Sequence, residues 1–258
     1  MGHLEGLLDT KNTNLWNELN NTCSIEVKIE NRPDYGVFSQ NRKYTIHVQK
    51  DNINPASFAH ELLHIYLKTK NVTIGGGLTL YIKGSPSLSR IFSENLLDHI
   101  SNSLEHVKMI PIFLDLGYKI YDFISDYHES KLTDENLSLL KKHFQVSTTH
   151  SNVTGIDYYI NKIKKHFQVS ATHYNATGID YYIGIYFAAK ACPNQVFNYS
   201  IQLNELKQFD PDLFNILESF WESWGNYDYT EKFASHHSFL IIFTEGLERW
   251  VTDKKITY

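Results

Sequence analysis

The sequence predicts an α+β fold, in which a small antiparallel sheet lies next to a helix with the motif H-E-x-x-H and a mostly helical C-terminal half follows. Apolar and polar residues alternate in short runs between residues 24 and 49, as in half-buried strands. Beyond residue 54 the apolar stretches are longer, and proline or glycine marks their ends. With 42% hydrophobic and 21% charged residues, the 258-residue chain has the composition of a globular protein.

Three short strands are expected before the motif. In the first, Ser24–Glu30, every second residue is a branched aliphatic one. Turn residues at 32–36 and 41–43 separate this strand from two further runs, Val37–Ser39 and Tyr44–Gln49. Since strands that follow one another through short turns usually pair in opposite directions, we expect one antiparallel sheet.

The motif itself is expected on a helix with clear ends. Asn54 is a good N-cap residue, and the proline after it suits the first helical position. The apolar residues that follow predict a helix over Pro55–Lys70, with Asn71 as a residue that can stop it.

Further elements are expected wherever apolar stretches meet helix starts and breakers. They are a flexible loop at Gly75–Gly77, a short strand at Leu78–Ile82, a helix over Ser87–Met109 closed by Pro111, a helical stretch over Ile112–Tyr127 interrupted near Gly117, a helix from Asp210-Pro211 to Trp224, and a last helix over Thr230–Thr252. Helices therefore dominate the second half of the chain.

A tandem duplication of 23 residues lies in this helical half, at 141–163 and 164–186. Over its first 20 positions the two copies share 17 residues. Each copy contains Thr-Gly-Ile-Asp, which resembles a capping box at a helix start, so each copy is expected to join the end of one helix to the start of the next. We expect a core over residues 1–130 and a helical region over 131–258 packed on it as one unit, with one copy dispensable.

Composition excludes several classes of partner. The formal net charge is −5 and no long basic run occurs, so nucleic acid is not an expected partner. No stretch of about 18 apolar residues predicts a membrane span. The N-terminal residues do not resemble a signal peptide, and Cys23 and Cys192 do not suggest a disulfide framework, so the expected location is the cytoplasm.

The motif H-E-x-x-H carries the chemistry that these residue types can support. His60 and His64 are four residues apart, so on a helix their imidazole rings lie on one face and can bind one zinc ion. Glu61 follows His60, and its carboxylate can take a proton from a water molecule that the metal activates.

A third ligand is expected from the helix after the motif. The metzincin continuation of H-E-x-x-H fails, because Leu67 and Lys70 stand where glycine and histidine belong. Glu94 and Asp98 instead share a helix face, so Glu94 can bind the metal while Asp98 accepts a hydrogen bond from a ligand imidazole.

With H-E-x-x-H at 60–64 and E-x-x-x-D at 94–98, the chain resembles the gluzincin zinc metallopeptidases, the thermolysin-like group. The resemblance covers about residues 24–109 and implies a zincin-like core. It implies His60, His64 and Glu94 as zinc ligands, Glu61 as general base and Asp98 as partner of a ligand histidine. It also implies that the strand before the motif helix, Tyr44–Gln49, pairs with an extended substrate.

Other residues remain open as parts of the site. His99 and His106 are seven residues apart on the same helix and can supply an alternative ligand or a hydrogen-bond donor. Glu105 can accept a hydrogen bond from a metal-binding imidazole. The group that would stabilise an oxyanion is not ranked among several histidines and a tyrosine in later segments, which are His150, His173, Tyr227, His236 and His237.

These observations predict a zinc-dependent metallopeptidase-like hydrolase with Zn²⁺ as cofactor and a peptide or protein as substrate. Two alternatives remain. One is a zincin-fold binding or regulatory protein without general peptidase activity. The other is a helical interaction protein in which H-E-x-x-H occurs by chance.

Overall fold

The computed structural model describes residues 4–40, 43–146, 178–231, 235–254 and 256, with no side chains described at 142–146. The described chain divides into two compact units, one made of residues 1–73 and 105–128 and the other of residues 74–104 and 129–258. The region 74–104, which the sequence assigned to an N-terminal core, thus groups with the C-terminal helices. The α+β class predicted from the sequence is confirmed.

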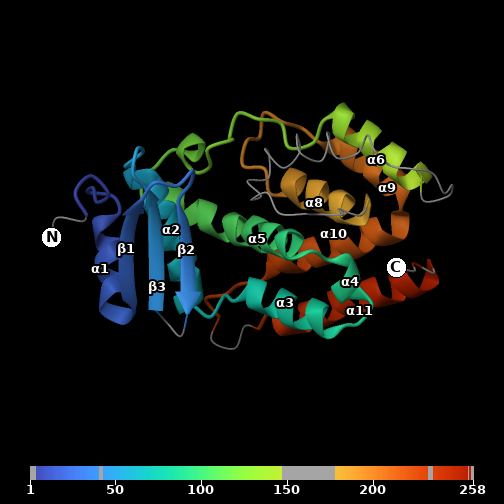
Figure 1. Cartoon of the computed structure of the whole chain (residues 1–258), viewed down its shortest axis with the longest axis horizontal. Coiled ribbons are helices and arrows are strands. Elements are labelled where there is room, and N and C mark those ends of the chain that lie inside the picture. The colour runs from blue at the N-terminus through green and yellow to red at the C-terminus, as the bar shows by residue number, and fades with distance from the viewer. Residues whose placement is uncertain (1–3, 41–42, 147–177, 232–234, 255, 257–258) are drawn as a thin grey trace. The chain divides into compact units, whose positions relative to one another are not determined.

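The first unit combines a sheet with helices (Figure 1). Its elements are α1 (Thr13–Thr22), β1 (Ser24–Glu30), β2 (Gly36–Gln40), β3 (Lys43–Gln49), α2 (Pro55–Thr69), the part of α5 from Glu105 onwards, and the short 3-10 helix η1 (Ile120–Asp122). Helix α2 packs against α1, β2 and β3. Fully buried residues such as Ile46, Phe58 and Leu62 form the core that these contacts create.

The sheet is mixed, so the prediction of a wholly antiparallel sheet is wrong. Its strand order is β1-β3-β2, with β1 parallel to β3 and β2 antiparallel to β3. A period of two in the sequence is the same for both directions of pairing, and the five residues between β1 and β2 leave room for β3 between them.

This strand order also leaves β3 without a free edge with which an extended substrate could pair. Residues 24–30 of β1 pair with one edge of β3, and residues 36–40 of β2 pair with the other. Because both edges are occupied, an extended peptide cannot add to β3, and that expectation is wrong as well. Within this sheet only β1 and β2 have an unpaired edge.

Helix α2 begins and ends as its sequence predicts. The Asn54 side chain accepts hydrogen bonds from the backbone N–H groups of Ala56 and Ser57, and Pro55 is the first helical residue. The helix ends at Thr69, and Asn71 then adopts a left-handed backbone conformation with a φ of 62°. These caps fix which residues fall on the second and third turns, where the H-E-x-x-H motif lies.

The helix that follows the motif differs from its prediction in length. Instead of one helix over Ser87–Met109, there are α4 (Leu88–Ile91) and α5 (Glu94–Asp115), and Pro111 lies inside α5 rather than closing it. Met109 and Phe113 on either side of this proline are fully buried. We attribute the continuation to this burial, which offsets the lost backbone hydrogen bond. Beyond α5, Gly117 has a φ of 89° and ends the helical stretch predicted over 112–127.

Helix α3 (Ile74–Gly84) of the second unit replaces the predicted glycine loop and short strand. Ile74, Leu78 and Ile82 recur every fourth residue and are fully buried. A Cβ at Gly77 would lie 2.5 Å from Leu240 of α11, so the helices approach closely only because this residue is glycine. Tertiary packing thus outweighs the low helix propensity of three glycines.

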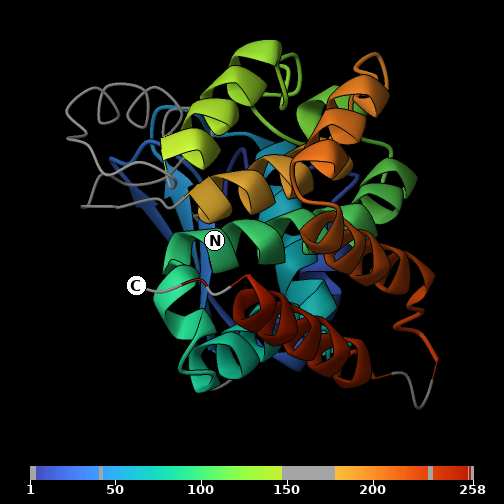
Figure 2. The same cartoon turned by 90° about the vertical axis from the view of Figure 1, so that its right-hand side faces the viewer.

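The remaining helices of the second unit are α6 (Asp134–Val146), α8 (Gly178–Lys190), α9 (Ser200–Phe209), α10 (Pro211–Asn226) and α11 (His237–Asp253). Helices α10 and α11 lie side by side (Figure 2), with Phe220 stacked on Phe243 at 4.1 Å. Helix α8 starts where the second copy of the duplication predicts, whereas residues 147–177 lie outside the described residues. Among the described helices, none is both long and apolar enough to cross a lipid bilayer.

Candidate metal centre

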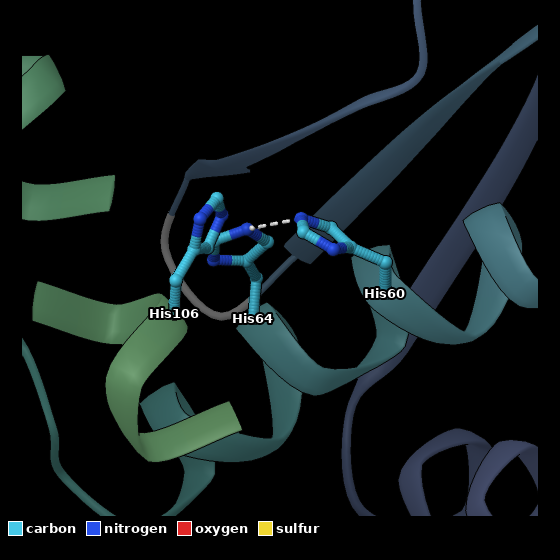
Figure 3. A group of neighbouring side chains, drawn as sticks. All are labelled: His60, His64 and His106. Carbon is cyan, nitrogen blue, oxygen red and sulfur yellow. Dashed lines mark hydrogen bonds between the residues drawn. The ribbon is translucent and has the colours of Figure 1, made fainter. Parts of the chain in front are cut away.

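Three histidines from two helices meet in the first unit (Figure 3). His60 and His64 come from successive turns of α2, and His106 comes from α5. One ring nitrogen of each lies within 4.8 Å of those of the other two. Among the described residues, these three side chains lie close enough together to hold one metal ion. They include both histidines of the H-E-x-x-H motif.

The nitrogens of the motif histidines are spaced as two ligands of one zinc ion would be. Their Nε2 atoms are 3.2 Å apart. In a tetrahedral zinc site, bonds of about 2.0–2.1 Å to each nitrogen place two ligand nitrogens roughly 3.3–3.4 Å apart. The residues therefore fit this metal without rearrangement of α2. In the structure as it stands, one of the two Nε2 atoms donates a hydrogen bond to the other.

A buried carboxylate orients the ring of His64. Its Nδ1 lies 2.6 Å from Glu105 Oε2, and both side chains are less than a tenth exposed. A carboxylate accepts hydrogen bonds but does not donate them, so Nδ1 carries the proton of this bond and Nε2 is the atom of His64 that can bind a metal. This is the carboxylate–histidine arrangement that accompanies metal-binding imidazoles.

An aromatic ring packs against two of the three histidines. The ring of Phe123 packs against His60 at 4.6 Å and against His106 at 5.1 Å, measured between centroids. Burial, and secondly the charge on His64, lower the pKa of His60 to about 3. His60 is therefore neutral at ordinary pH, which is the protonation state that a metal ligand needs.

Glu61 lies beside this group and is buried, with 7% of its surface exposed. Burial raises the pKa of its carboxyl group, while the charges on His64, Arg32 and Lys68 act in the opposite direction. A carboxylate whose pKa is raised is a better proton acceptor than one in water, yet it still ionises when positive groups lie near. Glu61 is therefore a buried carboxyl group with a raised pKa at the position where the sequence predicts a general base.

The other predicted residues of the motif pattern lie in the second unit. Glu94 is the first residue of α5, and both Glu94 and Asp98 are exposed. Neither belongs to the group of potential ligands among the described residues. On a continuous helix, the 12 residues from Glu94 to His106 rise by about 18 Å. The roles of Glu94 as a ligand and of Asp98 as a ligand's partner stay predictions from the resemblance.

The residues whose role the sequence left undecided lie in different parts of the structure. His106 lies with His60 and His64, and Glu105 contacts His64. His99 belongs to the second unit, where its Nε2 lies 3.0 Å from the carbonyl oxygen of Gly184 in α8. Tyr227, His236 and His237 also belong to the second unit, and His150 and His173 lie outside the described residues.

Sequence reasoning preferred Glu94 to His106 because Glu94 and Asp98 complete the gluzincin spacing, and it kept His106 only as an alternative ligand. The signal that could have found it is the pair Glu105-His106, where a carboxylate and an imidazole are adjacent in sequence, as Glu61 and His60 are.

Known proteins give no independent guide to this site. Comparison with them finds no matching family model, no matching curated protein and no matching solved structure. The resemblance to gluzincins is therefore limited to the spacing of His60, His64, Glu94 and Asp98.

Proposed function

We propose that this protein is a zinc-dependent hydrolase of the metallopeptidase type, with Zn²⁺ held by His60, His64 and His106. The convergence of three imidazoles beside Glu61 carries this proposal. Three histidine nitrogens that leave a fourth position open are a donor set typical of catalytic zinc. This set replaces the expected Glu94 by His106 and keeps the two motif histidines.

Each side chain has a definable part in peptide hydrolysis. Zinc bound there would lower the pKa of a water molecule and polarise the carbonyl group of a peptide bond. Glu61 accepts a proton from that water on its carboxylate and donates it to the nitrogen of the leaving amine. Glu105 holds the proton of His64 on Nδ1, and the ring of Phe123 keeps water away from one side of His60.

The test separates metal binding from turnover. Zinc content is measured by mass spectrometry of the metal, and cleavage is followed on a mixed peptide library. Wild-type protein should hold about one zinc per chain and cleave some peptides, and Glu61→Gln should keep the zinc and lose cleavage. Glu18→Gln, a change of an exposed glutamate on α1, is the matched control and should behave as wild type.

Two outcomes would contradict the proposal in different ways. Wild-type protein without zinc after incubation with the metal would exclude the metal centre. If the wild-type protein binds zinc but cleaves no peptide, and Glu61→Gln binds the same amount of zinc, the binding or regulatory alternative would instead be favoured.

A further inference from the structure

The ring of Phe123 packs between two of the three histidines of the candidate metal centre. Its centroid lies 4.6 Å from that of His60 and 5.1 Å from that of His106, and the two imidazole rings are 4.8 Å apart. The ring planes meet at angles of 49°, 78° and 80°, so edges pack against faces. Each ring therefore limits the rotation of the other two, because a turn of one would drive its edge into a neighbour.

His60 depends on this packing more than His64 does. The ring of His64 is held at Nδ1 by Glu105, at 2.6 Å. The Nδ1 atom of His60 is buried and has no hydrogen-bond partner among the described residues. Its Nε2 atom lies 3.2 Å from Nε2 of His64, and this hydrogen bond would be given up when both atoms bind one ion. With a metal bound, the orientation of His60 would thus depend on the rings around it.

Two further aromatic rings hold Phe123 in place. Phe113 lies seven residues after His106 on α5, and its ring packs edge to face against Phe123 at 5.1 Å. The ring of Tyr118 stacks on Phe113 at 4.9 Å. Each of these three aromatic side chains is less than a tenth exposed. Phe123, Phe113 and Tyr118 therefore form one buried aromatic series that ends at the histidines.

The other end of this aromatic series is fixed to the start of α2. The hydroxyl group of Tyr118 donates to the carboxylate of Asp9 at 2.9 Å, and the same carboxylate accepts from the backbone N–H of Asn12 at 3.0 Å. The Asn12 side chain in turn donates to the carbonyl oxygen of Pro55, the first residue of α2, at 3.1 Å. Because α2 also carries His60, the series connects the first turn of the motif helix to a histidine of the motif.

We propose that Phe123 is a positioning residue of the metal centre, which holds the imidazole rings of His60 and His106 in the orientation for one ion and keeps additional water away from that ion. This inference rests on the proposed function and adds to it a residue that acts through two of the ligands. An apolar ring beside the ligands limits the access of solvent, and a zinc ion that few water molecules can reach stays four-coordinate.

Substitution with cobalt(II) tests this proposal, because the visible absorption of the ion is intense with four ligands and weak with six. Wild-type protein that holds one cobalt ion should show the intense spectrum. Phe123→Leu keeps an apolar side chain but removes the flat ring, so it should lower the cobalt affinity by about 10-fold and weaken the visible absorption of the bound ion. Phe113→Leu should change the spectrum in the same direction, because it removes the ring that packs against Phe123.

Phe58→Leu is the matched control. Phe58 is also a fully buried ring of the first unit, and its described ring contact is with Trp16, at 5.7 Å. The substitution should lower the melting temperature, as Phe123→Leu does, but leave the cobalt spectrum and affinity unchanged. Thermal melting establishes that each variant is folded before spectra are compared. If Phe123→Leu does not fold, Phe123→Met, which retains more of the apolar volume, takes its place.

The failure of this proposal is distinguishable from that of the proposed function. A Phe123 variant that binds cobalt with the affinity and spectrum of the wild type would overturn the role of Phe123 alone. A spectral change of equal size in Phe58→Leu would also overturn it, because the change would then reflect a general loosening of the core. Wild-type protein that binds neither zinc nor cobalt would overturn the metal centre and this inference with it.

Discussion

The Nδ1 atom of His64 lies 2.6 Å from a carboxylate oxygen of Glu105, the residue that directly precedes His106 on α5. One turn of α5 therefore supplies two things to the site. Its Glu105 orients the imidazole ring of His64 through the hydrogen bond at Nδ1, and its His106 contributes a third imidazole ring. Both contributions depend on the same contact between α2 and α5. A change that disturbs this contact would therefore affect the orientation of His64 and the position of His106 together.

Glu105→Gln should weaken zinc binding by about 10- to 100-fold, because the amide keeps the size of the side chain but loses the charge that fixes the proton of His64. Zinc affinity is measured by competition with a chromophoric chelator. Glu18→Gln again serves as an exposed control and should leave the affinity unchanged. Unaltered affinity in Glu105→Gln would show that the contact has no part in metal binding.

The third ligand is decided by a comparison of two variants. His106→Ala should lose zinc bound at about one ion per chain, whereas Glu94→Gln should keep it, since Glu94 is exposed and lies outside the histidine group. Metal content after dialysis against a weak chelator is the measurement. The reverse result would restore the gluzincin pattern, in which Glu94 completes the site.

Local features of the fold were predictable where short-range chemistry determines them. Asn54 and Pro55 define the start of α2, and the alternation in Ser24–Glu30 defines β1, because capping and side-chain period are properties of neighbouring residues. Strand order was not predictable, since Val27 opposite Ile46 in a parallel pair leaves the same pattern in sequence as an antiparallel pair would.

The candidate site was predictable in part for a similar reason. His60, Glu61 and His64 lie on one helix, where spacing fixes relative position. The choice of third ligand depends on how far along α5 the contact with α2 falls, and about 18 Å of helix separates the two candidates, Glu94 and His106.

The stability of the protein should fall as the pH drops below about 6.5, in part because of His236. This histidine is 3% exposed, and burial together with the charge on His237 lowers its pKa. The unfolded chain takes up a proton near pH 6.5, whereas the folded chain does so only at lower pH. Stability from His236 is therefore present above pH 6.5 and is lost as the pH falls toward the lowered pKa, by at most about 1.4 kcal/mol per pH unit.

His236→Phe should reduce this loss, because phenylalanine keeps a ring beside Tyr227 without a proton to bind. Urea unfolding at pH 7 and pH 5 gives the two free energies to compare. The neighbouring His237 is exposed, so His237→Gln is a close control and should leave most of the pH dependence in place. A pH dependence that is equal in wild type and His236→Phe would contradict the assignment.

Deletion of residues 141–163 should leave a folded protein that binds zinc. The deletion joins Leu140 to Lys164, and the run 164–169 repeats the sequence of 141–146, so the sequence of α6 is unchanged. Helix α8 is also untouched, because it starts at Gly178 in the second copy. Soluble yield, thermal melting and zinc content are the measurements, and a melting temperature close to that of the full chain is expected.

Deletion of the second copy, residues 164–186, is the matched control and should destabilise the protein. It removes the same number of residues, but it places Asn161, Lys162 and Ile163 where α8 now has Gly184, Ile185 and Tyr186. Ile185 and Tyr186 are fully buried, and the hydroxyl group of Tyr186 donates to Glu218 at 2.9 Å. A lysine in the place of Ile185 would be buried without a partner of its own, at a cost of several kcal/mol. Equal stability of the two deletions would mean that α8 does not depend on the second copy.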